Sequence, residues 1–284
     1  MASRRRTALI ALAVLASLAC AGCGGGGGET DQVRSAAGTQ APGTQAPGTT
    51  AAVPPSVSSS APTPETTTAA AQPAPAAAPT VAPSPVDQLA GVGSAGQVIS
   101  VIADDYGQTT ATFTAYERDG SGWKQVFGPW TANLGSRGFA PPGEKHEGDN
   151  RTPSGAYGFD FAFGVLADPG VKLPYRPVSS GAIVWDDDPT SPSYNQWIDS
   201  STASAGNDPE PMYNQPAYNY GAVIAYNTNA TPGLGSAIFL HVTKGGSTAG
   251  CVAITQDQLV DVLRWLDPAQ KPRIVMGTRA AVTP

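Results

Sequence analysis

Short apolar runs separated by turn residues recur through residues 97–284, a pattern that predicts many short strands. Polar and apolar side chains alternate in residues 110–116, as is typical of a half-buried strand, and the Asp-Gly-Ser-Gly turn of residues 119–122 leads into a second strand at 123–127. Further strands are predicted at residues 98–102, 156–163, 181–185, 222–226, 237–241 and 273–276.

One helix is predicted to begin at Thr255, which forms a capping-box pair with Gln258. Pro268 lies just beyond the expected end of this helix. Many short strands with a single late helix predict a mainly β domain, either a sandwich or an open barrel. The apolar face of the helix is made by Leu259, Val260, Val262, Leu263 and Leu266.

The N-terminal residues have a different pattern. Three arginines at positions 4–6 precede an apolar stretch at 8–19 that is too short to span a membrane and is typical of a secretory signal. Ala21 and Gly22 stand directly before Cys23, as in a bacterial lipoprotein signal. We therefore expect residues 1–22 to be a signal peptide and Cys23 to be lipidated. Cys20 is the alternative acylation site, and simple secretion is the alternative route.

Residues 23–96 contain mostly Gly, Ala, Pro, Thr and Ser, and the sequence Gly-Thr-Gln-Ala-Pro occurs twice within residues 38–47. Such a stretch cannot bury enough apolar surface to offset the entropy lost on ordering, so we expect a disordered linker. Residues 97–284 are long enough for one domain with a sizeable core. The expected location is the outer face of the cell membrane, through the lipid anchor, or the cell wall after secretion.

The charge pattern narrows the possible partners. The chain has 22 acidic and 16 basic residues, and residues 97–284 contain no basic cluster with interleaved aromatics. Nucleic acid is therefore not an expected partner. Two histidines and one thiol without paired ligand spacing predict no metal site, and no cofactor is expected. An acidic run at 186–188 lies in a long stretch without clear periodicity, where we expect surface loops or a binding lid.

Cys251 is the one cysteine beyond the signal-like N-terminus, so it is either an inert buried side chain or a nucleophile. The apolar run 237–240 ends on His241, and a Gly-rich turn then leads back to Gly250 and Cys251. A thiol beside an imidazole is the minimum for cysteine catalysis. We predict an accessible, activated Cys251 nucleophile, His241 as its general base and an oxyanion site at the Gly250 backbone. His146 is predicted to be solvated.

Three stretches resemble the catalytic domain of L,D-transpeptidases, of the YkuD or ErfK/YbiS type. They are the run Lys-His-Glu-Gly-Asp-Asn-Arg-Thr-Pro-Ser-Gly at 145–155, His241, and the run Thr-Ala-Gly-Cys at 248–251. Three positions depart from the commoner family pattern. Val242 stands where Gly is usual, and Ala249 and Ala253 stand where a histidine and an arginine are often found. These departures concern the contacts to substrate carboxylates rather than the nucleophile and the base.

The resemblance implies acyl transfer on peptidoglycan stem peptides. The thiolate attacks the carbonyl of the third residue of a tetrapeptide stem and releases the terminal D-alanine, and a side-chain amine of a second stem completes a 3→3 cross-link. With water as acceptor the same site is an L,D-carboxypeptidase. Arg151 and Thr248 are the expected substrate contacts, although Arg151 also suits a hairpin turn. The alternatives are a non-catalytic wall-binding lipoprotein and a general cysteine protease, whose known signatures are absent.

Overall fold

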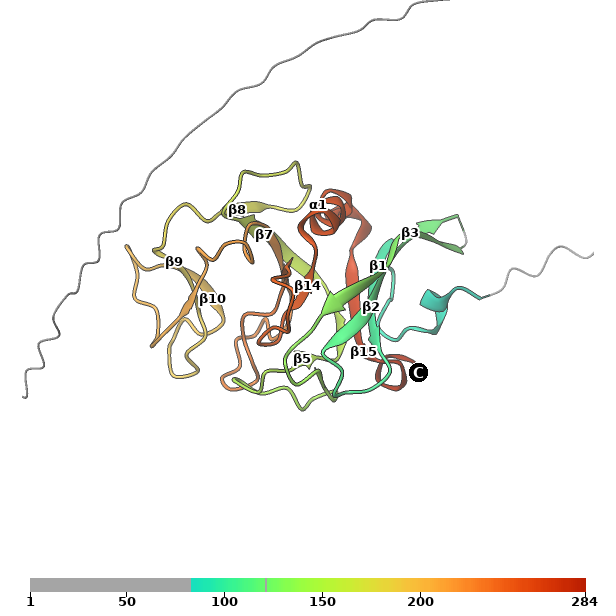
Figure 1. Ribbon diagram of the computed structural model, residues 1–284, viewed down its shortest axis with the longest axis horizontal. Coiled ribbons are helices and arrows are strands. Elements are labelled where there is room, and N and C mark those ends of the chain that lie inside the picture. Colours follow the sequence, from blue (N-terminus) through green and yellow to red (C-terminus); the bar gives the residue numbers. More distant parts are fainter. Residues whose placement is uncertain (1–82, 121) are drawn as a thin grey trace, which may run out of the picture. The chain divides into compact units, whose positions relative to one another are not determined.

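The structure is a computed structural model that describes residues 83–120 and 122–284. These residues form a mainly β unit with a curled ten-stranded sheet, a three-stranded sheet and a two-stranded sheet (Figure 1). The predicted fold class is therefore confirmed. The signal peptide, Cys20, Cys23 and most of the linker lie outside the described residues. Within the described part of the chain, no helix has the length and apolar content needed to cross a membrane.

The strands follow a spatial order that differs from their order in the chain. The large sheet consists of β6 (Gly155–Tyr157), β15 (Arg273–Thr278), β1 (Gln97–Ala103), β2 (Thr110–Asp119), β3 (Gly122–Asn133), β14 (Val252–Ile254), β13 (Phe239–Val242), β12 (Gly221–Ile224), β7 (Phe159–Gly164) and β8 (Tyr175–Pro177). The smaller sheets are β10 (Gln196–Asp199), β9 (Ile183–Asp186) and β11 (Glu210–Pro211), and β4 (Phe139–Ala140) with β5 (Thr152–Pro153). The helices are α1 (Gln256–Trp265), α2 (Arg279–Val282) and the 3-10 turns η1 (Pro85–Gln88) and η2 (Pro268–Gln270).

Most predicted strands are confirmed, but the single strand predicted at 156–163 is wrong. The chain breaks at Gly158 into β6, which pairs with β15, and β7, which pairs with β12 and β8. In the sheet order β6 is the first strand and β7 is next to the last strand, β8, yet one residue joins β6 to β7. The sheet must therefore curl to bring β6 close to β7, which gives it the form of a half-barrel. A continuous strand at 156–163 would have paired with the same neighbouring strands along its whole length.

The predicted helix is confirmed as α1. Thr255 is its N-cap, and the backbone N–H of Thr255 donates to Gln258 Oε1 at 3.2 Å. Leu259, Val262 and Leu263 are buried and belong to the same core cluster as Leu240 and Val252 of the sheet. The short helix α2 was not predicted, because four residues are too few for a helical period to be visible.

The folded part of the chain begins before residue 97. Val86 in η1 is 1 % exposed and packs with Val98, Val275 and Val282. The backbone N–H of Ala90 donates to the carbonyl of Val282 at 2.7 Å. A few apolar side chains ahead of residue 97 thus pack this segment against the domain. The limits of the signal peptide, the linker and the domain stay predictions.

The two faces of the sheet at β13 and β14 pack against different core clusters. Residues two apart in a strand share a face. Leu240 and Val252 therefore face α1 and the main core, whereas Phe239 and Cys251 belong to a second cluster with Trp185 of β9. The three-stranded sheet covers this second face, and Figure 1 shows β9 and β10 at the end of the unit opposite the β2–β3 hairpin. The side chains predicted to carry the chemistry lie between the two sheets.

Candidate active site

His241 and Cys251 are positioned by two parallel neighbouring strands. In β13 and β14, Leu240 pairs with Val252 and His241 pairs with Ala253, two residues beyond Cys251. Both side chains therefore leave the sheet on the face away from α1. They line one cleft of about 330 Å³, to which Gly250 and Thr248 also contribute. The structure thus brings together the thiol, the imidazole and the Gly-rich turn that the sequence singled out.

The thiol of Cys251 is buried and held by backbone groups. Cys251 is 7 % exposed, its Sγ–H donates to the carbonyl of Ala237 at 3.3 Å, and its Sγ accepts from the N–H of Phe239 at 3.3 Å. Burial raises the pKa of the Cys251 thiol to about 12, although the Phe239 N–H opposes this shift. The prediction of an accessible, activated thiol is therefore wrong for the free cleft. The thiol is protonated and must lose its proton to a base during the reaction.

His241 has the protonation state that such a base requires. Its Nδ1 lies 2.9 Å from the carbonyl oxygen of Val242. Because a carbonyl can only accept, Nδ1 carries the proton, and the lone pair is left on Nε2. Burial lowers the pKa of His241 to about 4, and the nearby charge of Lys244 adds to this shift. The imidazole is therefore neutral at physiological pH.

Tyr218 orients the imidazole from the side. The rings of Tyr218 and His241 lie edge to face with centroids 5.4 Å apart. The Tyr218 hydroxyl donates to Glu210 Oε1 at 3.0 Å, so the tyrosine is itself fixed. Burial raises the pKa of Tyr218 and of Glu210 above their ordinary values. Tyr218 therefore packs against His241 with its hydroxyl protonated. Sequence reasoning missed this contact, because Tyr218 stands in a stretch without periodicity and has no motif around it.

The segment that precedes Cys251 is held by threonine hydroxyls. Thr248 Oγ1 donates to the Cys251 carbonyl at 2.8 Å and accepts from the Gly250 N–H at 3.1 Å. Thr152 of β5 donates to the same Cys251 carbonyl at 3.4 Å. In this state Thr248 supports the turn, and the Gly250 N–H is already occupied. A substrate contact by Thr248 and an oxyanion contact by Gly250 stay predictions.

Gly250 is required by a close approach of two backbones. A Cβ atom at this position would lie 3.0 Å from the carbonyl oxygen of Arg151 and 3.3 Å from Ile238 Cδ1. The φ angle of Gly250 is +156°, which side-chain-bearing residues rarely adopt. The Gly-Cys pair thus lets the turn lie directly against the loop that contains Arg151.

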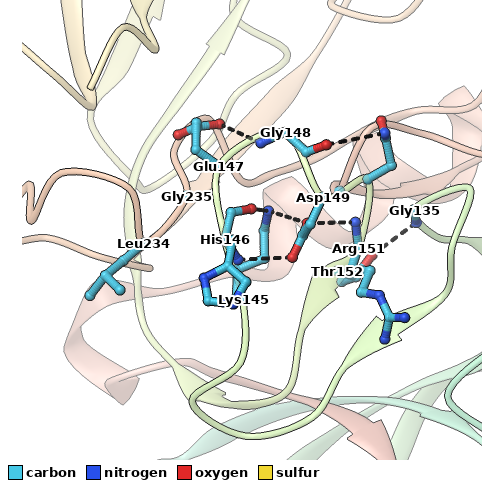
Figure 2. A network of polar contacts seen from close by, with 12 residues as sticks. Gly135, Lys145, His146, Glu147, Gly148, Asp149, Arg151, Thr152, Leu234 and Gly235 are labelled. Carbon is cyan, nitrogen blue, oxygen red and sulfur yellow. Dashed lines mark hydrogen bonds and ion pairs between the residues drawn. The ribbon is translucent and has the colours of Figure 1, made fainter. Parts of the chain in front are cut away.

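The loop at residues 145–152 is built around a shielded ion pair (Figure 2). Lys145 Nζ lies 2.7 Å from Asp149 Oδ1, and the two side chains are only 6 % and 12 % exposed. Burial alone would raise the pKa of Asp149, but hydrogen bonds from His146, Lys145 and Arg151 hold it below its ordinary value. Lys145 also lines the cleft, where its positive charge opposes the rise in the Cys251 pKa.

The same loop shows where two predicted residues lie. The guanidinium of Arg151 donates to the carbonyl of Phe139 at 3.3 Å, and Figure 2 shows its side chain extending away from Lys145. Arg151 is not among the residues that line the cleft, so the predicted substrate contact would require its side chain to move. His146 is exposed, as predicted for a solvated histidine. The described residues contain no group of His, Cys, Asp and Glu side chains that could hold a metal ion.

The cleft also contains acidic residues that sequence reasoning missed. Glu147, Asp187 and Glu210 line it together with His241 and Cys251. The run at 186–188 was visible as a cluster of charge, but no local pattern showed which aspartate faces the cleft. Glu210 carried no signal, because it is a single acidic residue in a stretch without periodicity.

A family model for the YkuD L,D-transpeptidase catalytic domain matches residues 101–280. The chain belongs to this family. A search of curated proteins found no match, and a search of solved structures also found none. Membership of the L,D-transpeptidase family implies an enzyme that acts on peptidoglycan peptides. The matched region contains the whole cleft, including the departures Ala249 and Ala253, which both line it.

Proposed function

We propose that this L,D-transpeptidase family member is a cysteine-dependent enzyme that forms 3→3 cross-links between peptidoglycan stems. The observation that carries the proposal is the shared cleft of Cys251 and His241, with Nδ1 of His241 bound to the Val242 carbonyl and Nε2 left to accept a proton. A side chain that served packing alone would not need a fixed imidazole tautomer beside it.

The chemistry follows from these protonation states. As Sγ of Cys251 bonds to the carbonyl carbon of the third stem residue, the thiol proton passes to Nε2 of His241. The tetrahedral intermediate collapses when the bond to D-alanine breaks, and His241 returns the proton to the leaving amine. The thioester then reacts with an acceptor amine, which forms the new amide and restores the thiol. Backbone N–H groups at Cys251, and at Gly250 once Thr248 releases it, are the proposed oxyanion donors.

Two further parts of the proposal concern the acceptor and the location. With water in place of the amine, the same intermediate gives L,D-carboxypeptidase activity. We also propose that Cys23 anchors the protein by lipid to the outer face of the membrane, so that the domain acts in the wall. Growth with a labelled fatty acid tests this anchor: label should be incorporated into the native chain and be lost in the Cys23→Ala variant, with Cys20→Ala as the matched control.

The function is tested by incubating the purified protein with a disaccharide-tetrapeptide and identifying every product by mass spectrometry. A cross-linked dimer with free D-alanine supports the proposal, whereas tripeptide alone identifies a carboxypeptidase. Unchanged substrate with measurable binding would identify a wall-binding protein. Cys251→Ala should abolish all products, while His146→Ala should leave them unchanged because His146 is exposed and lies outside the cleft.

A further inference from the structure

Three consecutive aspartates after β9 have different surroundings. Asp186 and Asp188 are enclosed by hydrogen-bond donors that hold the surrounding loop. Asp187 lines the cleft, and among the described residues its carboxylate accepts only from its own backbone N–H. The donors to Asp186 are Ser191 Oγ at 2.5 Å, Ser193 Oγ at 2.6 Å, the Gly206 N–H at 3.0 Å and the Asp188 N–H at 3.1 Å. The donors to Asp188 come from Thr190 and Asn207.

Asp187 contributes to an excess of negative charge in the cleft. Burial raises the pKa of Asp187 to about 6, and the charges of Glu147 and Glu210 add to this shift. Two lysines also line the cleft. Lys145 pairs with Asp149, whereas Lys244 donates to the Asn214 side chain at 2.9 Å and its charge opposes part of the rise in the Glu210 pKa. None of the three cleft carboxylates has an ion-pair partner among residues 83–120 and 122–284.

A buried hydroxyl in the same cleft also lacks a partner. Ser236 is 6 % exposed and lines the cleft, and its Oγ lies near the Tyr194 hydroxyl without a hydrogen bond of ordinary length to any described residue. A buried polar atom without a partner is costly, so a bound ligand with a polar group there would be favoured. Ser236 is also next to Ala237, whose carbonyl accepts the thiol of Cys251.

The spacing of the cleft carboxylates indicates which class of ligand they would bind. Among the described residues, no three His, Cys, Asp or Glu side chains lie close enough together to hold a metal ion. Separated carboxylates and a hydroxyl instead suit an organic cation with several N–H donors. A primary ammonium group has three such donors.

We propose that Asp187 and Glu210, with Ser236, form a subsite for the primary ammonium group of the acceptor stem. This inference rests on the proposed function for the identity of the acceptor, and it assigns the choice of an amine over water to these side chains. The bound ammonium lies beside Cys251, and once it loses a proton to the Asp187 carboxylate its neutral amine can attack the thioester carbonyl.

The direct test is calorimetric binding to the Cys251→Ala chain, in which no turnover occurs. The two probes are a tetrapeptide stem with a free side-chain amine at its third residue and the same peptide acetylated on that amine. Acetylation should weaken binding about tenfold, the value of one charge-assisted hydrogen bond. With Asp187→Asn added, the two probes should bind within about twofold of each other. The added control Asp208→Asn, an exposed aspartate whose positive φ asparagine also tolerates, should keep the tenfold difference.

Equal binding of both probes to the Asp187-containing chain, or an undiminished difference after Asp187→Asn, would overturn the inference. The products of turnover provide a second test. Asp187→Asn should lower the ratio of dimer to tripeptide several-fold, and an unchanged ratio would also contradict the subsite. Absence of any D-alanine release from the wild type would instead contradict the proposed function, and the binding comparison would still decide whether the subsite exists.

Discussion

The thiol of Cys251 donates to the carbonyl of Ala237, with Sγ and the oxygen 3.3 Å apart. Ala237 is held in turn by Asn195, whose Oδ1 accepts the Ala237 N–H at 3.2 Å. The nucleophile is thus held as a neutral thiol on a backbone segment that is fixed by the residue directly before β10 of the three-stranded sheet. Substrate must displace this hydrogen bond before the proton can pass to His241.

Because the Cys251 thiol is buried and protonated, it should react slowly with general alkylating agents. With its pKa raised to about 12, native Cys251 should be alkylated by iodoacetamide at pH 7.5 on the order of 100-fold or more slowly than in the urea-unfolded chain. The rate is measured by mass spectrometry of the peptide that contains Cys251. Equal rates in the native and unfolded chains would show that the thiol is already activated.

The sequence predicted the nucleophile and the base more completely than it predicted the other side chains that line the cleft. Cys251 and His241 were predictable because a strand, a Gly-rich turn and a lone cysteine are local features. The cleft carboxylates were not, because Asp187 and Glu210 reach the cleft through the three-stranded sheet, whose pairing is set by tertiary contacts. The break at Gly158 was missed for the same reason, since the curling of the whole sheet decides it.

The Thr248 hydroxyl should matter for both stability and rate. Thr248→Val removes the hydrogen bonds to the Cys251 carbonyl and the Gly250 N–H, and should lower the free energy of unfolding by about 1–3 kcal/mol. D-alanine release should also slow, because the Gly-Cys turn loses its support. Thr248→Ser keeps the hydroxyl and should stay close to wild type. Urea unfolding and D-alanine assays measure both effects, and identical behaviour of the two variants would contradict the role of the hydroxyl.

Asn195 should act through Ala237 rather than on the substrate. Its Oδ1 accepts from the Ala237 N–H and from Trp185 Nε1, the latter at 3.0 Å. Asn195→Ala should therefore lower the free energy of unfolding by about 2 kcal/mol or more and speed the alkylation of Cys251. Asn195→Asp keeps these two acceptor contacts and should retain slow alkylation. A fast-reacting Asn195→Asp chain would show that the acceptor contacts do not hold the thiol.

Stability should depend on pH through His241. Its pKa is about 4 in the folded chain against an ordinary 6.5, so between these values the unfolded chain binds more protons. The free energy of unfolding should therefore fall as pH drops from 6.5 towards 4, by about 3 kcal/mol in total, and this contribution is complete above pH 6.5. Asp187 acts in the opposite sense, because its pKa is raised to about 6.

The two groups are separated by comparing variants at each pH. The difference in unfolding free energy between wild type and His241→Gln isolates the imidazole, because Asp187 is common to both chains. This difference should shift in favour of His241→Gln as the pH falls from 7.5 to 4.5. A constant difference for His241→Gln would mean that the imidazole is not held neutral by burial.

The central claim is that Cys251 carries the acyl group of the stem. Wild-type protein incubated briefly with the tetrapeptide donor and quenched in acid should gain the mass of the tripeptide acyl group, and peptide mapping should locate it on Cys251. His241→Gln should accumulate this adduct far more slowly, and Cys251→Ala should show none. An acyl group found on another residue, or one that persists in Cys251→Ala, would contradict the account.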